Sequence, residues 1–354
     1  MSTLVADILQ RPDIIFPARV APLPNILACS NEAEFNPAWD HHIRTVAYAA
    51  RATHFGPLIL GLLPQTVHCI GEACLLVDGN DAVSDRLPHA LRGNPAALAE
   101  QIARPREIVE IATECFLLGR YGTGTWGHWL GEIVPVAAVV ERAFPGRFRY
   151  ATPVHRGRYG DIQRQSLHAY GITADRLIEM RHDATYVFQS AWTLTPIWTD
   201  HAPHPAALDI MRGAVQLGAY RPGLSRIILD RSNKERELIE AEGAYAMMRS
   251  AGFVRVSPAD LDFVDQVRLF QGASDIVSVI GSGLTGLIYS PDRVRVLGLA
   301  PASWGDRFFY ALGQHRNAAW SEVRGQSCGE DRRIAPFSIT LAAVQHGFDA
   351  AFSH

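Results

Sequence analysis

The sequence predicts an α/β protein of two Rossmann-like domains with a cleft between them, plus a small β-rich N-terminal region. The first observation is the length, because 354 residues suit two domains of ordinary size. The second is an alternation of short apolar runs with helical spacing from residue 108 onward, which is typical of a parallel sheet. The third is a glycine-rich turn, residues 281–286, which directly follows an apolar run.

The boundary between the domains is predicted at a proline- and histidine-rich stretch, residues 196–205, giving domains of residues 1–205 and 206–354. Short apolar runs broken by glycine and proline in residues 57–78 predict small strands in hairpins. The elements expected in the first half after that are helices 95–103, 129–144 and 161–170 and strands 115–118, 148–154, 176–180 and 184–194. Those expected in the second half are helices 207–217, 238–251, 263–271, 284–289 and 339–352 and strands 225–230, 253–256, 275–280 and 294–299.

The composition is that of a globular protein, with 48% hydrophobic and 19% charged residues. With a net charge of −3, the chain lacks the overall excess of basic residues that is typical of nucleic-acid-binding proteins. No apolar stretch reaches the roughly 18 residues that a membrane span needs, and no signal peptide is evident. The five cysteines are scattered without framework spacing, which favours a reducing compartment. We expect a cytoplasmic protein, with peripheral membrane contact left open.

The glycine-rich turn reads Gly281-Ser282-Gly283-Leu284-Thr285-Gly286, after a strand and before a helix. Glycines let a ligand approach the backbone, and the first amides of a helix favour an anion, so the turn predicts phosphate binding. Dinucleotide binding is the rival interpretation. It is opposed by the short helix, by the lack of an acidic residue after the next strand, and by the turn's late position in the chain. A purely structural turn remains open.

A second candidate phosphate site is the basic segment that follows the strand at residues 225–230. It contributes Arg231, Lys234 and Arg236. Ligands of open α/β sheets bind at the carboxyl ends of strands, and arginine suits phosphate oxygens. The alternative is a solvated loop whose charge Glu235 neutralises.

The candidate catalytic residues follow a loop with four glycines, residues 119–127. His128 and Glu132 are four residues apart and therefore share one helical face. A histidine can act as a general base near neutral pH, and Glu132 can orient it. The indoles of Trp126 and Trp129 are candidates for stacking on a pyranose ring. The alternative is a structural histidine packed beside tryptophans.

A metal site has weaker support. Asp260 and Asp262 form the Asp-x-Asp pattern that metal-dependent glycosyltransferases use, but they immediately precede a predicted helix, where capping is the simpler role. The histidines at positions 41, 42, 201 and 204 form no coherent ligand set. We therefore expect no metal and no cofactor.

Five segments, in order, resemble glycosyltransferase family 61, the DUF563 or capsular-polysaccharide type. Residues 121–135 contain a His-Trp-Leu triplet before a helix and proline, and residues 227–236 end a strand in an Arg-Ser pair with a second arginine downstream. The others are residues 167–176, 252–267 and 273–291. Three positions depart from the family pattern: Ile280 replaces a histidine, Gly286 replaces an asparagine, and the asparagine expected near residues 239–242 is missing.

The resemblance implies a GT-B architecture, with the acceptor on the N-terminal side and a nucleotide-sugar in the C-terminal half. It also implies transfer that inverts the anomeric centre without a metal, from a donor that is often UDP-linked, in bacterial surface polysaccharide synthesis. His128 would then be the base. Arg231 and the amides of residues 282–285 would hold the diphosphate. A catalytically degenerate binding partner and, less favoured, an NAD(P)-dependent oxidoreductase remain alternatives.

Overall fold

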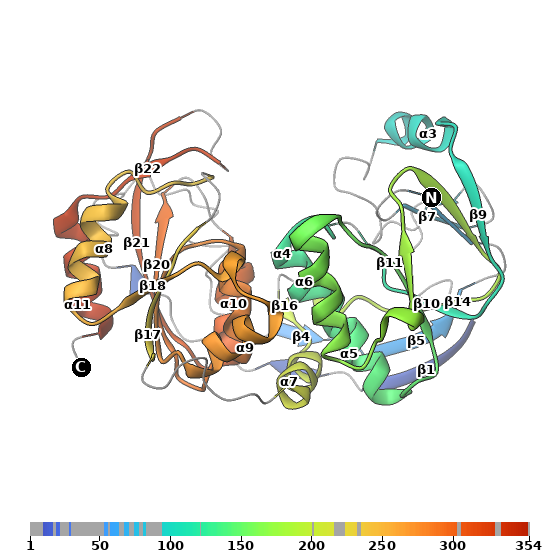
Figure 1. Ribbon diagram of the computed structural model, residues 1–354, viewed down its shortest axis with the longest axis horizontal. Helices are drawn as coiled ribbons and strands as arrows, with labels where there is room; N and C mark the ends of the chain where they lie inside the picture. Colours follow the sequence, from blue (N-terminus) through green and yellow to red (C-terminus); the bar gives the residue numbers. More distant parts are fainter. Residues whose placement is uncertain are drawn as a thin grey trace. The chain divides into compact units, whose positions relative to one another are not determined.

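The computed structural model describes residues 94–352 except 121, 200–201, 216–223, 232–234, 303–305 and 330–333; before residue 94 it describes the strands named below with residues 57 and 63. The chain forms two compact units, shown in Figure 1. The first comprises Met1–Val20, His54–Thr199 and Pro203–Ala214, and the second comprises Ala21–Thr53, Asp200–Ala202 and Val215–His354. The mixed α/β class predicted from the sequence is confirmed.

The first unit is built on a six-stranded sheet with the order β1-β5-β14-β10-β11-β12. Its strands are β1 (Gln10–Phe16), β5 (Leu58–Leu62), β10 (Cys115–Leu117), β11 (Arg149–Pro153), β12 (Leu177–Met180) and β14 (Ala191–Leu194). The last four run parallel, whereas β5 is antiparallel to β14. The chain proceeds from β10 outward to β12 on one side and returns to β14 on the other, which makes β10 the point where the strand order reverses.

A second sheet covers one face of the first, with the order β8-β7-β6-β13-β9. Its strands are β6 (Val67–Ile70), β7 (Cys74–Val77), β8 (Asp81–Ala82), β9 (Glu107–Ile111) and β13 (Ala184–Phe188). Alternate residues of the parallel strands, such as Cys115 and Leu117, share a buried cluster with Tyr186 and Phe188 of this sheet. A doubly wound domain would carry helices on that face, so the first unit departs from the predicted Rossmann-like layering.

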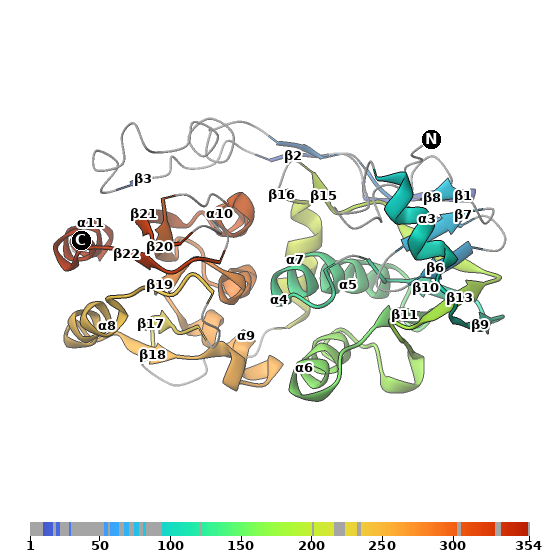
Figure 2. The same ribbon diagram turned by 90° about the horizontal axis from the view of Figure 1, so that it is seen from above.

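Helices pack on the other face of the six-stranded sheet, as Figure 2 shows. They are α4 (Trp126–His128), the π-helix η3 (Trp129–Ile133), α5 (Val134–Ala143), α6 (Gly157–His168) and α7 (Pro205–Ala214), with α3 (Pro95–Ala103) and the 3-10 turn η4 (Ala174–Arg176) elsewhere in the unit. Tyr150 of β11 donates a hydrogen bond to Glu141 of α5 at 2.8 Å. Helix α7 packs against α5. The boundary after residue 205 remains a prediction.

The second unit contains a largely parallel sheet with the order β18-β17-β19-β20-β21-β22. Its strands are β17 (Arg226–Leu229), β18 (Val254–Val256), β19 (Asp275–Val279), β20 (Arg295–Pro301), β21 (Ala319–Ser327) and the antiparallel β22 (Phe337–Ser338), with β3 (Ala28–Cys29) paired to β21. Short two-stranded sheets join β2 (Arg19–Ala21) to β4 (Thr53–Phe55) and β15 (Trp198–Thr199) to β16 (Ala202–Pro203).

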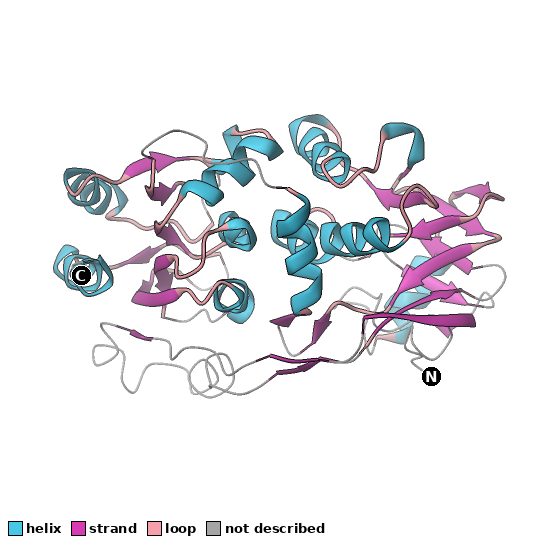
Figure 3. Cartoon of the chain, turned by 90° about the horizontal axis from the view of Figure 1, so that it is seen from below, coloured by secondary structure: helices cyan, strands magenta, loops and turns pink. Residues whose placement is uncertain are grey.

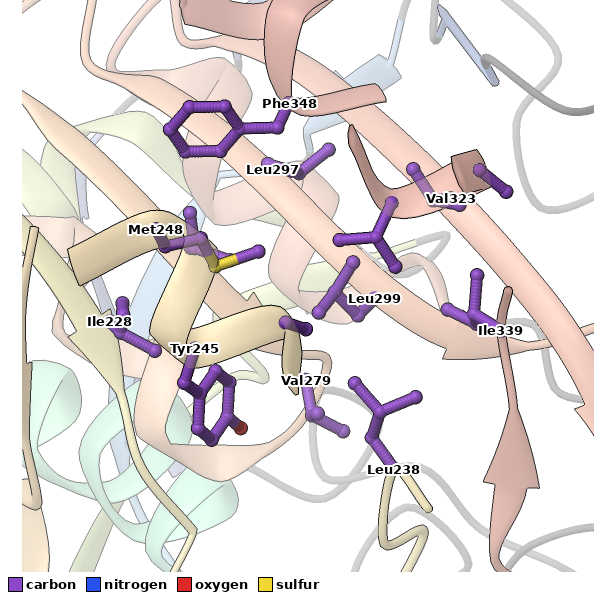
Figure 4. Packing of buried hydrophobic residues seen from close by; sticks show 14 of the residues in the cluster. Ile228, Leu238, Tyr245, Met248, Val279, Leu297, Leu299, Val323, Ile339 and Phe348 are labelled. Carbon is purple, nitrogen blue, oxygen red and sulfur yellow. The ribbon is translucent and has the colours of Figure 1, made fainter. Parts of the chain in front are cut away.

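Helices cover both faces of this sheet, as the secondary-structure colours of Figure 3 show. They are α8 (Ala241–Ser250) and α11 (Leu341–Phe352) on one face, and α9 (Phe263–Gly272), α10 (Arg307–His315) and the 3-10 helix η6 (Ser282–Tyr289) on the other; the short 3-10 turn η5 (Pro258–Asp260) precedes α9. The core between α8, α11 and the sheet includes Met248, Phe348 and Leu297, labelled in Figure 4. This unit therefore matches the predicted doubly wound domain.

Candidate functional site

In the first unit, His128 and Glu132 lie just beyond the carboxyl end of β10. The Nδ1 atom of His128 is 2.5 Å from Oε1 of Glu132. The other carboxylate oxygen, Oε2, is 2.7 Å from Nη2 of Arg120. The side chain of His128 is 40% exposed, whereas that of Glu132 is 10% exposed, so the buried carboxylate holds an imidazole that reaches solvent.

This geometry sets the tautomer of His128. With a proton on Nδ1 facing the carboxylate, the lone pair of the ring lies on Nε2, and Arg120 pairs with the other carboxylate oxygen of Glu132. Such an imidazole can accept a proton from a hydroxyl group, and the carboxylate then stabilises the imidazolium. The expected juxtaposition of His128 and Glu132 is confirmed. Arg120 was not predicted, although its position three residues after β10 is where site residues of parallel sheets are found.

Glu132 lies in a π-helix, and the sequence explains why. Pro135 has no N–H group, so it cannot donate to the carbonyl of Gly131 four residues earlier. Instead, Nε1 of Trp198 donates to that carbonyl at 2.7 Å. The local ring widens, and the amide of Val134 donates to the carbonyl of Trp129. Such π-turns within α-helices are frequent at functional sites.

The glycine-rich loop packs directly against the side chain of His128. Gly122 has a φ of +97°, a conformation that side chains rarely adopt, and a Cβ atom there would lie 2.7 Å from Cγ and 2.8 Å from Cβ of His128. The next carbonyl, that of Thr123, accepts hydrogen bonds from Tyr159 at 2.9 Å and from Gln163 at 3.0 Å. Helix α6 thereby fixes the loop on which the imidazole rests.

We expect Gly122→Ala to lower any activity that depends on His128 by about 100-fold or more, because a displacement of about 1 Å at a reacting group has that effect. Gly146→Ala is the matched control, since Gly146 has a φ of +73° but no neighbour that a Cβ would touch. Both substitutions strain the backbone, but only Gly122→Ala also displaces the His128 ring. Comparing the steady-state rates of the two variants therefore separates these two effects. Equal losses in both would show that contact with His128 is irrelevant.

The two tryptophans next to His128 have different environments. Trp126 is partly exposed, and its ring contacts that of Tyr159 edge-on, with 6.3 Å between centroids. Trp129 is fully buried, and its indole N–H donates to Ser166 at 2.9 Å. A ring without an exposed face cannot stack on a sugar, so the assignment of Trp129 to the acceptor is corrected: it is a core residue that anchors the π-helix to α6.

In the second unit, Arg231 and Gly281 lie at the carboxyl ends of the neighbouring strands β17 and β19. The chain leaves β17 for β18 on one side, whereas β19, β20 and β21 follow on the other, so these two ends flank the position where the strand order reverses. Nη1 of Arg231 donates to the carbonyl of Ile280 at 3.1 Å. A Cβ on Gly281 would collide with the same nitrogen. The guanidinium thus lies directly over the glycine turn.

The electrostatics of this position favour an anion. Burial, and next the positive charge of Arg236, lower the pKa of Arg231 to about 10. Burial is also the main cause of a lowered pKa at Arg236. Two partly desolvated like charges destabilise each other, and a phosphate would relieve that repulsion. Lys234 lies outside the described residues.

The amides of the glycine turn are not all equivalent. The amide of Leu284 donates to the carbonyl of Gly281 at 2.9 Å, and the hydroxyl of Thr285 donates to the carbonyl of Ser282 at 2.8 Å. Leu284 and Thr285 are both fully buried, whereas Ser282 and Gly283 are partly exposed. The predicted contacts of a diphosphate therefore narrow to the amides of Ser282 and Gly283, because the Leu284 amide is already engaged.

The departures at Ile280 and Gly286 have local structural causes. Ile280 is buried, and its side chain packs against Gly298 of β20. A Cβ atom added at Gly298 would lie 2.9 Å from Cδ1 of Ile280. At Gly286 a Cβ would collide with the ring of Phe270 from α9. The side chain missing at position 286 is thus replaced in space by Phe270, and Ile280 is a core residue rather than a ligand contact.

The contact with Phe270 makes Gly286→Asn a stability prediction. We expect this variant to lose about 3 kcal/mol or more of unfolding free energy, because an overpacked core cannot relax around a rigid ring. Urea denaturation followed by circular dichroism measures the loss. Gly213→Asn, in an open position on α7, should have far less effect. Because Phe270→Ala is itself destabilising at a buried site, the double variant should lose less stability than the sum of the two single losses. An unchanged midpoint in Gly286→Asn would contradict the packing argument.

Asp262 occupies the N-cap position of α9 but its side chain makes no capping hydrogen bond, and Asp260 does not lie at a cap position. Asp260 ends the 3-10 turn η5, and Asp262 is the residue before the first turn of α9. Among the described residues, no group of three histidine, cysteine or acidic side chains has the arrangement of a metal site. In the same part of the chain, no helix has both the length and the apolarity to cross a membrane.

The structure thus places a carboxylate-held histidine at the edge of one parallel sheet and a buried arginine over a glycine turn at the edge of the other. The sequence model described as Glycosyltransferase 61 matches residues 126–297, which include His128, Arg231 and Gly281. This match confirms the resemblance to glycosyltransferase family 61 that was stated from the sequence, and it supports a glycosyltransferase in general. A search of curated proteins finds no match.

Proposed function

We propose that this chain is an inverting, metal-independent glycosyltransferase that moves a hexose or pentose from a UDP-linked nucleotide-sugar to a saccharide acceptor. The observation that carries the proposal is the chain of contacts from Arg120 through Glu132 to His128 within the family region. The proposal includes a GT-B arrangement with a cleft between the units. It also includes a cytoplasmic role in bacterial surface polysaccharide synthesis.

The proposed reaction is a single displacement. The acceptor oxygen forms a bond to the anomeric carbon while the bond from that carbon to the diphosphate breaks, which inverts the configuration. The hydroxyl proton passes to Nε2 of His128, and Glu132 stabilises the imidazolium. Arg231 and the amides of Ser282 and Gly283 stabilise the negative charge that develops on the departing diphosphate. Fixed donors of this kind take the place of a metal ion.

A thermal-shift screen with a chelator present tests the donor class. We expect UDP and UDP-sugars to raise the melting temperature, because a ligand at 100 times its Kd stabilises the native state by about 2.7 kcal/mol. NADH and NADPH should leave it unchanged. Stabilisation by the nicotinamide dinucleotides alone would favour the oxidoreductase alternative.

The departures at Ile280 and Gly286 motivate one other candidate, a degenerate glycosyltransferase that binds its ligands without turnover. Its signature would be stabilisation by a UDP-sugar with neither transfer to any saccharide nor hydrolysis of the donor. Ile280 is buried, and Phe270 fills the space beside Gly286. This packing favours a local rearrangement of the family pattern over loss of the site.

A further inference from the structure

The segment that leaves β17 is bonded to a distant strand of the same sheet. In the strand order, β19, β20 and β21 separate β17 from β22. Residues 236–239 nevertheless lie beside β22, where Leu238 forms a parallel bridge with Phe337. The amide of Phe337 donates to the carbonyl of Glu237 at 2.9 Å, and its carbonyl accepts from the amide of Ile239 at 3.0 Å. The basic segment after β17 is therefore tied to a strand that comes much later in the chain.

Arg236 enters this contact in an unusual backbone conformation. Its φ is +52°, in the left-handed region that residues with a side chain rarely adopt. Its amide donates to the carbonyl of Ile334 at 2.8 Å, so the segment before β22 also bonds to the turn. Conformations of this kind cost energy, persist only where the surroundings impose them, and cluster at functional sites. The turn at Arg236 therefore needs an anchor outside itself.

Glu240 supplies such an anchor through its side chain. Its Oε1 accepts a hydrogen bond from the hydroxyl of Ser338 at 2.5 Å, and its Oε2 accepts one from the amide of Ile339 at 3.1 Å. Ser338 is also paired with Gln326 of β21. Ile339 and Leu238 belong to the buried cluster of the unit, as Figure 4 shows. The carboxylate thus ties the end of the basic segment to a strand that the core holds in place.

The anchored turn brings two positive charges together. Burial is the main cause of the lowered pKa of Arg231, and the charge of Arg236 is the next. Glu235 and Asp306 act on Arg236 in the opposite direction, but burial outweighs them and its pKa is lowered too. Two guanidinium groups so placed repel each other, and an unanchored segment would let them move apart. Held together, they suit a ligand with several phosphate oxygens.

We propose that Glu240 is a positioning residue for the donor diphosphate. By bonding to the segment of residues 334–339, it holds the left-handed turn at Arg236 and keeps that guanidinium beside Arg231. The inference rests on the proposed function, because it takes the diphosphate to bind at Arg231. It adds Arg236 as a second phosphate contact, and it makes residues 334–339 a support of the donor site.

Calorimetric titration of the full chain with UDP tests whether Glu240 acts through Arg236. Arg236→Gln and Glu240→Ala should each weaken UDP binding about tenfold, the size of one hydrogen bond to a charged group. The double variant should bind UDP as weakly as Arg236→Gln alone, to within about twofold, because both changes remove the same contact. Independent roles would instead add up to a loss of about 100-fold.

Further variants separate the hydrogen bonds of Glu240 from its charge. Glu240→Gln can keep both bonds, since its Oε1 can accept from the Ile339 amide while its Nε2 donates to the Ser338 hydroxyl. It should therefore bind UDP to within about twofold of the wild type. Ser338→Ala removes only one bond and should give a smaller loss than Glu240→Ala, which keeps the test valid if the latter folds poorly. Glu237→Ala removes an exposed carboxylate from the same segment and is the matched control.

Hydrogen exchange without any ligand tests the anchor separately from donor binding. The amides of Arg236 and Ile239 should exchange about tenfold faster in Glu240→Ala than in the wild type, and Glu240→Gln should restore their protection. Unchanged exchange, wild-type UDP affinity in Glu240→Ala, additive losses in the double variant, or a failure of Glu240→Gln to restore binding would each overturn the proposal. The proposed function fails by a different observation, namely that the wild type neither binds nor consumes a nucleotide-sugar.

Discussion

Replacing His128 by alanine should lower the rate of sugar transfer by about 10²–10⁴-fold, the usual contribution of a general base. The affinity for the nucleotide-sugar should stay unchanged, because His128 lies in the first unit and the proposed phosphate contacts lie in the second. Glu132→Gln retains the shape of the carboxylate but removes the charge that stabilises an imidazolium. It should therefore lower kcat with little effect on KM.

Steady-state kinetics of transfer, with donor binding measured in parallel by calorimetry, separates these effects. His168→Ala serves as the control, since it removes an exposed histidine elsewhere in the first unit. A shift in the pH dependence of kcat in Glu132→Gln would distinguish a role at the base from a structural one. Transfer by His128→Ala at the wild-type rate would show that another group accepts the proton.

The second large effect is expected at Arg231. Arg231→Ala should weaken UDP binding at least tenfold and lower kcat by about 10²–10³-fold, because a buried cation near the leaving diphosphate acts most strongly in the transition state. Gly281→Ala should have the same two effects as Arg231→Ala. The added Cβ would collide with the far end of the Arg231 side chain, which can move aside without disturbing the sheet.

Calorimetry with UDP and urea denaturation, carried out on the same samples, check this pair. Both variants should unfold near the wild-type midpoint while losing affinity. Arg249→Ala, an exposed arginine on α8, controls for the loss of one positive charge in this unit, and Gly213→Ala controls for the added methyl group. Full UDP affinity in Gly281→Ala would place the diphosphate away from this arginine.

The sequence predicts most of the second unit because its elements carry strong local signals. The alternation of strand and helix there reproduces β17 to β20, and helix α9 begins at the predicted residue 263. Helix α10 and strand β21 were not predicted; in β21 the apolar residues Trp320 and Val323 alternate with charged ones. Arg324 and Glu322 are in fact fully buried, and they pair with each other, so the local pattern hides a core strand.

The first unit shows where local pattern is insufficient. Residues 184–194 were predicted as one strand but form β13 and β14, which belong to different sheets. The π-helix depends on Trp198, a donor 67 positions away from Gly131. Trp129 could not be assigned to the core from the sequence, since its partner Ser166 lies on another helix.

The candidate site could be predicted as far as its residues follow strand ends or share one helical face. His128 and Glu132 are adjacent, as their spacing indicates, and Arg231 lies over Gly281 because parallel strands end at a common edge. Arg120 and Tyr159 were missed, since their roles come from contacts between separate loops. The catalytic roles themselves remain predictions.

The most direct test of the central claim is product analysis with purified protein, a panel of UDP-sugars, saccharide acceptors and a chelator. Mass spectrometry would detect the added sugar, and NMR would report its anomeric configuration. We predict transfer without a metal, with inversion at the anomeric carbon, and its loss in His128→Ala. Retention of configuration, or undiminished transfer by His128→Ala, would contradict the account.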